Sequence, residues 1–363
     1  MVQADMKLLR SNQKAALFAL GAAALYAINI PLSKLLLQQV QETMLAALLY
    51  LGAGVGMLLT GLIQRGVTRQ KPQAAPLTRK ELPYTVAMVL LDILAPILLM
   101  LGISRTSPAN VSLLNNFEIV ATSLIALVIF REVISKQLWL AIGLVTLASI
   151  LLSLEPGGAL RFDQGSLLVL GACLCWGFEN NCTRKISHKS SQEIVVIKGC
   201  FSGLGSLLIA LMLGERLPGL RFVVAALGLG FVSYGLSINC YILAQKDLGA
   251  AKTSAYYSIA PFLGVAFSLV LLGERPGPRF YLALAIMALS AVLMARDSVK
   301  LQHSHTHQHT HTHPHRHGEL VHTHPHTHTH SHLHVHRGDL EDHAHPHGDL
   351  PDHHHSHHPG QSL

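Results

Sequence analysis

The sequence predicts an all-α integral membrane protein: ten transmembrane helices in two inverted repeats of five, followed by a disordered histidine-rich tail. Three observations lead to this fold class. Half of the 363 residues are hydrophobic, and the mean hydropathy is positive although the chain from residue 303 onward is almost wholly polar. The apolar residues form separate runs, each close to the roughly 20 residues that cross the hydrocarbon core of a bilayer. The runs of the second half resemble those of the first, which indicates an internal duplication.

Five apolar runs belong to each half, and polar connections separate them. The runs are Ala15–Leu36, Thr43–Ile63, Leu82–Ile103, Pro108–Phe130, Gln137–Leu154, Ser166–Thr183, Glu193–Leu213, Phe222–Leu243, Ala250–Leu272 and Phe280–Ala295. The chain therefore divides into an N-terminal segment (1–14), a first repeat (15–154), a connection (155–165), a second repeat (166–296) and the tail (297–363). No small-residue cleavage site follows the basic N-terminal residues, so we expect the first run to remain as a span.

The duplication can be followed residue by residue. Residues 106–155 align without a gap on residues 248–297, 142 positions later, and this offset pairs Glu118 with Ala260 and Asp92 with Tyr234. An earlier segment of each half aligns Asn29 with Glu179. Because five spans per half is an odd number, the second half must cross the bilayer in the opposite sense. Inverted repeats are typical of secondary transporters, which bind their substrate near the midplane.

Lysine and arginine are concentrated in alternate connections. They gather in the N-terminus and in the connections after the second and sixth runs, whereas the other connections carry single or acid-balanced charges. The positive-inside rule then predicts that both termini lie in the cytoplasm and that the protein lies in the cytoplasmic membrane. The formal net charge of +7 comes from these clusters, so it indicates topology and does not favour nucleic-acid binding.

Short motifs at the ends of two corresponding runs add a family resemblance. Phe130-Arg131-Glu132 and Leu272-Gly273-Glu274 end the fourth and ninth runs, while Thr106-Ser107-Pro108-Ala109 and the GAAKTS segment 249–254 open them. With these motifs the chain resembles the EamA-type transporters of the drug/metabolite transporter superfamily over residues 15–296. The resemblance implies a ten-helix transporter of a small organic molecule, mostly outward, without specifying the substrate. The histidine-rich tail departs from the common pattern.

Polar side chains inside the apolar runs are the candidate substrate-binding or proton-coupling residues. An ionisable group near the bilayer centre is costly enough to indicate function. Glu118 is the first candidate, because protonation removes most of the cost of burying it; a buried acid satisfied by its neighbours is the alternative. We expect Glu118 and Asp92 to share a cavity. The full set is Glu118, Asp92, Glu179, Asn115, Asn116, Asn180, Asn29 and Tyr234.

Other residues in or near the runs have structural interpretations. Lys198 enters the seventh run only a few residues from its cytoplasmic end, so we expect it to reach the interface as an anchor, and we expect the same of Lys34 at the outer end of the first run. Glu132 and Glu274 end corresponding runs and fit a capping role. The five cysteines lie inside runs and lack the spacing of a metal site, which indicates packing.

The tail contains all but one of the 25 histidines, most of them as His-x-His. A segment of this composition cannot bury a core, so we expect disorder. Neutral imidazole binds zinc, nickel, cobalt and copper, and a flexible chain can bring several imidazoles to one ion. The candidate ligands are His303, His305, His307, His309, His311, His313, His322, His324, His326, His328, His330, His353, His354 and His355. Supply of metal for export, metal sensing, buffering and pH sensing all stay open.

The sequence favours a secondary transporter that exports a small organic metabolite, an amino acid or a similar molecule, by alternating access and without a required cofactor. Two alternatives stay open: an exporter of nickel, cobalt or zinc fed by the tail, and a membrane-anchored metal store or sensor that transports nothing. The apolar runs contain no histidine, which argues against metal as cargo. No nucleophile–base arrangement, phosphate loop or H-E-x-x-H motif indicates an enzyme. A homodimer is compatible with the sequence.

Overall fold

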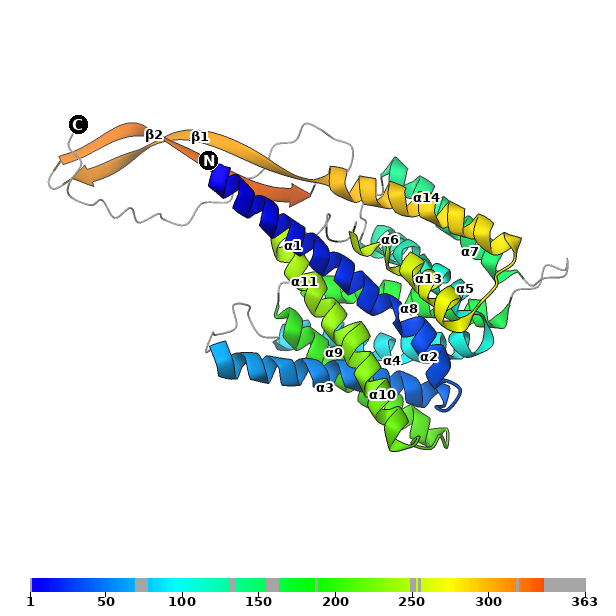
Figure 1. Cartoon of the computed structure of the whole chain (residues 1–363). Helices are drawn as coiled ribbons and strands as arrows, with labels where there is room; N and C mark the ends of the chain where they lie inside the picture. The colour runs from blue at the N-terminus through cyan, green and yellow to red at the C-terminus, as the bar shows by residue number, and fades with distance from the viewer. Residues whose placement is uncertain are drawn as a thin grey trace.

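The computed structural model is a bundle of long helices with a β-hairpin at one end (Figure 1). The structure describes residues 2–68, 78–130, 135–154, 163–186, 189–248, 253, 256–317 and 320–335. Each predicted apolar run coincides with helical residues in this part of the chain. The all-α fold class expected from the sequence is therefore confirmed for the bundle.

The helices follow the predicted runs, and several runs are divided into shorter helices. The first half contains α1 (Val2–Ala27), α2 (Asn29–Leu36), α3 (Glu42–Thr68), the 3₁₀ turn η1 (Arg79–Glu81), α4 (Leu82–Arg105), α5 (Pro108–Leu114), α6 (Phe117–Phe130) and α7 (Lys136–Ser153). The second half contains α8 (Gln164–Ile186), α9 (Ser191–Met212), α10 (Leu220–Gly230), the π-helical segment η2 (Phe231–Leu236), α11 (Ser237–Leu248), α13 (Ala260–Leu272) and α14 (Pro278–Leu301).

Irregular backbone interrupts three of the spans. Pro31 lacks the N–H that would bond to the carbonyl of residue 27, and α1 ends at Ala27. The helices α5 and α6 separate at Asn115 and Asn116, where the Asn116 side-chain amide donates to the Leu113 carbonyl at 2.9 Å and competes with the helical ladder. The eighth span contains η2, a type of irregularity that is frequent at functional sites.

Eight of the described helical segments are long and apolar enough to cross a membrane. Of the two other predicted spans, α13 is apolar but has 13 residues, and α8 has 23 residues but carries Glu179, Arg184 and Lys185. The helix α8 packs against both α4 and α6. Glu179 is therefore placed inside the bundle, whereas Arg184 and Lys185 are exposed at the end of α8.

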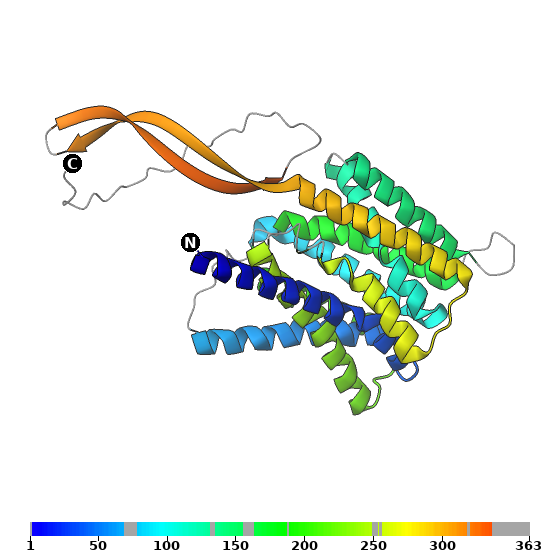
Figure 2. The same ribbon diagram turned by 45° about the horizontal axis from the view of Figure 1, so that its top comes forward.

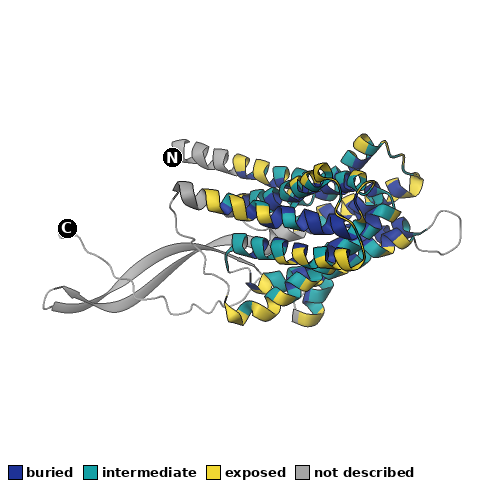
Figure 3. Cartoon of the chain, turned by 90° about the horizontal axis from the view of Figure 1, so that it is seen from below, coloured by how far each residue is buried: buried dark blue, intermediate teal, exposed yellow. Residues whose placement is uncertain are grey.

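The outer surface of the bundle is apolar. The side chains of Val128, Met212 and Val270 are 75%, 86% and 81% exposed, and Figure 3 shows exposed residues along the outward faces of the helices. A large apolar surface marks a region that contacts lipid or protein rather than water. The exposed faces of these long helices therefore fit a bilayer environment.

The two halves pack through matching helix pairs. The helix α3 packs against α9, α7 against α14, α5 against α13, α4 against α8 and α1 against α11. When the halves are exchanged, the α3–α9 and α7–α14 pairs map onto themselves and the last two pairs map onto each other, as a two-fold relation between the halves requires. The contact of α3 with α9 is close, since a Cβ atom added to Gly199 would lie 2.4 Å from the backbone nitrogen of Gly54.

The two ends of the bundle carry different parts of the chain. The helix α1 begins and α14 ends at one end, the terminal end, while the α2–α3 and α13–α14 connections lie at the other, the opposite end (Figure 2). Gln137 at the start of α7 donates from Nε2 to the Leu293 carbonyl of α14 at 3.0 Å. The start of α7 therefore also lies at the terminal end.

Residues 302–317 and 320–335 of the histidine-rich tail form two extended segments. The backbone forms β1 (Gln302–His317) and β2 (Leu320–Val335), which pair antiparallel. The alternation of histidine with threonine supplies a reason, because β-branched residues favour extended backbone and strand pairing satisfies the N–H and C=O groups of a segment without an apolar core. Residues 336–363, which include His353, His354 and His355, lie outside the described residues.

The contact of α3 with α9 predicts that Gly199→Ala destabilises the protein by about 1–3 kcal/mol, because the new methyl group meets backbone atoms of α3 that cannot move independently. The matched control is Gly143→Ala in α7, where an added Cβ meets nothing within 4 Å. The control should be neutral or more stable by about 0.5–1 kcal/mol from helix propensity. Thermal unfolding in detergent measures both, and equal effects of the two substitutions would contradict the close contact.

Candidate functional site

A cavity of about 710 Å³ lies between the two halves. Leu138 near the start of α7 and Met294 and Ala295 near the end of α14 line it, so the cavity extends toward the terminal end. Its polar and aromatic wall residues are Tyr26, Tyr50, Asn115, Asn116, Glu118, Thr122, Ser123, Trp176, Glu179, Asn180, Lys198, Tyr234, Tyr241, Tyr257 and Ser258. Six of the eight residues in the sequence-predicted candidate set are among them.

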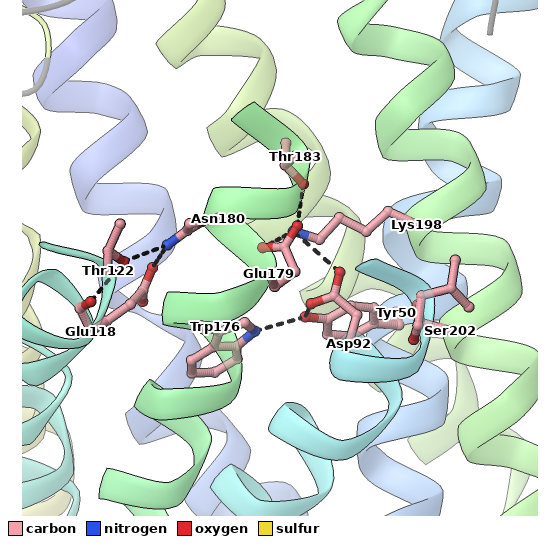
Figure 4. A network of polar contacts seen from close by, with 11 residues as sticks. Tyr50, Asp92, Glu118, Thr122, Trp176, Glu179, Asn180, Thr183, Lys198 and Ser202 are labelled. Carbon is pink, nitrogen blue, oxygen red and sulfur yellow. Dashed lines mark hydrogen bonds and ion pairs between the residues drawn. The ribbon is translucent and has the colours of Figure 1, made fainter. Parts of the chain in front are cut away.

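A three-residue ion cluster lies at one side of the cavity (Figure 4). The Lys198 ammonium of α9 lies 2.9 Å from a Glu179 carboxylate oxygen of α8 and 3.2 Å from an Asp92 carboxylate oxygen of α4. Tyr50 donates to the other Asp92 oxygen at 3.1 Å, and Thr183 donates to Glu179. Asp92 and Glu179 are buried, so each depends on these partners to offset its desolvation.

The interface-anchor prediction for Lys198 is wrong. Its side chain points into the bundle toward the two carboxylates and is 22% exposed (Figure 4). The free-energy gain from pairing with two buried acids outweighs the alternative of extending the ammonium to the membrane interface. The anchor role was predicted because Lys198 lies close to the end of its span. The sequence does not show which neighbouring helices its side chain faces.

Glu118 lies on the other side of the cavity, at the start of α6. One of its carboxylate oxygens accepts a hydrogen bond from the Asn180 side-chain amide at 2.7 Å. The same amide lies 3.3 Å from the Thr122 hydroxyl, which in turn donates to the Glu118 backbone carbonyl at 2.8 Å (Figure 4). Within the part of the chain that the structure describes, no Lys, Arg or His lies within ion-pairing distance of Glu118.

The structure separates two predicted candidates from the cavity wall. Asp92 is fully buried and reaches Tyr50 and Lys198 without lining the cavity, which differs from the expectation that it shares a cavity with Glu118. Asn29 lies behind the wall, where its side-chain amide donates to the Tyr234 hydroxyl at 2.9 Å. The Ser33 hydroxyl donates to the Asn29 side-chain oxygen at 3.2 Å. Asp92 and Asn29 therefore lie behind the cavity wall and orient Tyr50 and Tyr234, respectively.

Five tyrosine rings form a continuous row along the cavity. Neighbouring ring centroids lie 5.4 Å apart for Tyr50 and Tyr234, 6.0 Å for Tyr234 and Tyr26, 6.0 Å for Tyr26 and Tyr257, and 5.2 Å for Tyr257 and Tyr241. These rings come from α1, α3, the eighth span and the segment before α13. The sequence-predicted candidate set contains Tyr234 from this row, but the row itself was not predicted, because its five rings come from four different segments of the chain.

Hydrogen bonds to helix ends connect the halves at the opposite end. Glu274 accepts from the Ala109 N–H at the start of α5 at 3.0 Å, which agrees with the predicted capping role, whereas Glu132 lies outside the described residues. Burial raises the pKa of the Glu274 carboxyl, and the Ala109 N–H and the Lys34 charge oppose that rise. Glu215 accepts from the N–H groups of Thr43 and Met44 at 3.4 and 2.7 Å.

Lys34 closes the same end from α2. Its ammonium donates to the carbonyls of Ile103, Ser104 and Thr106 at 2.6, 3.3 and 3.2 Å. These carbonyls are at the end of α4, where the last carbonyls of a helix lack partners within it. The interface-anchor prediction for Lys34 is therefore replaced by a capping contact.

Comparison with known families matches the two halves separately. The model of the EamA-like transporter family matches residues 13–154 and again residues 163–296. The chain belongs to the EamA-like transporter family. It is therefore a multi-pass membrane transporter.

Curated relatives of this EamA-like transporter carry general names. An uncharacterized transporter of Methanothermobacter thermautotrophicus is 26% identical over 269 residues, which cover 70% of this chain and 78% of the relative. The uncharacterized inner membrane transporter YedA of Escherichia coli K12 is 24% identical over 163 residues, 44% of this chain and 53% of that protein. One crystal structure superimposes with a TM-score of 0.57 at 18% identity, covering 79% of this chain and 97% of that one, which supports the fold.

The ion cluster of this EamA-like transporter predicts unequal effects of removing its members. Lys198→Met leaves two buried carboxylates without a cation and should lower the free energy of unfolding by about 3–5 kcal/mol. Asp92→Asn leaves a one-to-one pair of Lys198 with Glu179, so it should cost less than half as much. Thermal unfolding in detergent measures the difference.

The double variant with both substitutions is the control for this ion cluster. It should be more stable than Lys198→Met alone, because one of the two uncompensated charges has been removed. If Asp92→Asn destabilises the protein as much as Lys198→Met does, the cluster does not depend on charge balance.

Proposed function

We propose that this protein is a secondary transporter that exports a small organic metabolite from the cytoplasm by alternating access. The observation that carries the proposal is the cavity between two duplicated halves, which extends toward one end of the bundle while hydrogen bonds of Glu215 and Glu274 connect the halves at the other. Rocking of one half against the other would expose such a cavity to each side in turn. The odd number of predicted spans per half favours the inverted relation that this motion uses.

The charge distribution supports an orientation in the cytoplasmic membrane. The basic N-terminus and the basic connections after the second and sixth runs belong to the terminal end, which the positive-inside rule assigns to the cytoplasm. The structure then corresponds to a state whose cavity extends toward the cytoplasm and whose outer end is closed. This state is the one in which an exporter collects its substrate.

Glu118 is the proposed substrate-contacting and proton-coupling residue. It is the acidic residue of the cavity wall that has only neutral hydrogen-bond partners among the described residues, whereas Glu179 is paired with Lys198. A carboxyl group in this position can hold a proton when the site is empty and release it when a substrate binds. Substrate binding and proton release would then occur at the same carboxyl group, which couples substrate transport to proton transport.

An organic cargo fits the cavity better than a transition metal does. Among the residues that the structure describes, no group of three or more His, Cys, Asp and Glu side chains could hold a metal ion. The wall instead combines aromatic rings with amide and carboxyl groups, the mixture that small-molecule sites commonly have. We therefore propose an organic metabolite as the cargo and assign metal to the tail alone.

The tail is proposed to bind a divalent transition metal as a buffer or regulator. The register of the hairpin supports this role, because seven histidine positions of β1 stand opposite seven of β2, from His303 with His334 to His315 with His322. Directly opposed residues on paired strands are close enough for both to be ligands of one metal ion. Zinc, nickel, cobalt and copper all accept imidazole.

Transport into inside-out membrane vesicles tests the proposed function. Vesicles with the full chain should accumulate one or more compounds from a radiolabelled set of amino acids and related metabolites, and should not accumulate zinc, nickel or cobalt above empty vesicles. Glu118→Gln should lower the initial rate at least about tenfold, since it removes a charge-assisted contact. Glu42→Gln, outside the cavity wall, should leave the rate unchanged. Accumulation of metal that requires the tail would establish a metal exporter instead.

Zinc titration tests the tail. The full chain should bind several zinc ions, and a chain ending at Lys300 should bind none with comparable affinity. Exchanging each histidine of β2 with the residue after it keeps the composition but moves the histidines out of register with β1. That variant should bind zinc on the order of tenfold more weakly, as when ligand geometry is disturbed. Unchanged affinity would show that histidine number alone decides binding.

A further inference from the structure

We infer that the cavity recognises an organic cation: a protonated or quaternary amine joined to an apolar body. The inference rests on the proposed transport function, because it assigns a substrate class to the same cavity. Three observations carry it: the balance of charges around the cavity, the hydrogen-bonding groups near Glu118, and the row of tyrosine rings. Each points to positive charge on the ligand.

The charges around the cavity do not cancel. Lys198 is already engaged by Glu179 and Asp92, so one ammonium faces two carboxylates in that cluster. Glu118 adds a third carboxyl group, which the described residues leave without an ion-pairing partner. A ligand that brings one positive charge to Glu118 reduces this excess, whereas an anionic ligand increases it.

The groups next to Glu118 are placed to hold the donors of an amine. Asn115 precedes Glu118 by one helical turn, and its backbone carbonyl accepts the Glu118 N–H at 3.1 Å. The side-chain oxygen of Asn115 is buried in the cavity wall and accepts no hydrogen bond from the described residues. Buried acceptors of this kind usually have a partner. An ammonium group has donors for both this oxygen and the Glu118 carboxylate.

The row of tyrosines supplies the rest of a cation site. Ring faces carry negative electrostatic potential, so cations bind over them within about 6 Å of the centroid. Tyr26 and Tyr257 line the same cavity as Glu118, and their centroids lie 6.0 Å apart. Trp176 extends the aromatic wall and donates from Nε1 to Tyr50 at 3.3 Å. These rings also accept an apolar body, which a hydrated metal ion does not have.

The size of the cavity agrees with a ligand larger than an inorganic ion. Its volume of about 710 Å³ lies within the range of roughly 300–1,000 Å³ that small organic ligands occupy. The wall contributes a negative charge at one side and aromatic surface around it. Selection would therefore depend on a positive charge attached to an apolar group of moderate size.

Binding of benzyltrimethylammonium to the purified full chain tests the inference without requiring transport. The chain has two tryptophans, so Trp139→Phe leaves Trp176 in the cavity wall as the fluorescent reporter, and isothermal titration supplies an independent Kd. The cation should bind and change the fluorescence of Trp176. Phenylacetate, an aromatic anion of similar size, should not bind in the same concentration range.

Variants of the wall separate a charge-specific site from general affinity for apolar molecules. Glu118→Gln should weaken binding of benzyltrimethylammonium at least about tenfold, the effect of losing one charge-assisted contact. Tyr257→Leu should weaken it several-fold through loss of an aromatic face. Glu118→Asp should restore part of the affinity, which excludes misfolding as the cause, and Glu42→Gln should match the unsubstituted protein.

The outcomes distinguish this inference from the proposed function. Binding of phenylacetate in preference to the cation, or equal binding of the cation by Glu118→Gln and the unsubstituted protein, overturns the inference and leaves transport of another molecule intact. Cation binding that depends on Glu118, without flux of any tested molecule in vesicles, supports the site and overturns the transport function.

Discussion

The position of Lys198 is the constraint on which the rest of the site depends. The neighbouring Gly199 packs against the backbone of α3 at Gly54, so α9 cannot shift without separating the two helices. This contact holds the lysine between the buried carboxylates of α4 and α8. Three helices thus meet at one ammonium group while α3 packs beside it, and the cost of leaving any of these charges unpaired keeps the three together. The remaining wall of the cavity is built outward from that junction.

The scaffold is nearly symmetric, but the chemistry is not. Exchanging the halves maps the helix pairs of the bundle onto one another, whereas the acids have neutral counterparts: Ala260 corresponds to Glu118, and Tyr234 corresponds to Asp92. Both counterparts line the cavity. The duplication therefore supplies two similar walls, and Glu118 gives the first of them an acid that the second lacks at the corresponding position.

The sequence was sufficient for features that depend on local composition or on the repeat. The spans, the two halves and the presence of Glu118 in an interior position follow from hydropathy and from the cost of burying charge. The role of Lys198 could not be predicted, because its partners come from two other helices and depth in a span says nothing about rotation. The tyrosine row was not predicted either, because its rings come from several segments whose relative rotation the sequence does not give. The pairing of β1 with β2 does not follow from composition, because its register depends on the alternation of histidine with other residues.

The contacts at the opposite end of the bundle and those at the ion cluster differ in whether water can take their place. At the opposite end, Glu215 and Glu274 accept from N–H groups of helix ends in the other half, and water would satisfy these groups if the halves separated. In the middle, Lys198 and its carboxylates are shielded from water, so separating them would leave buried charges uncompensated. The contacts that water can replace therefore lie at the opposite end, and the costly ones lie at the ion cluster. Under the proposed alternating access, this distribution suits a pivot near the ion cluster and a gate at the opposite end.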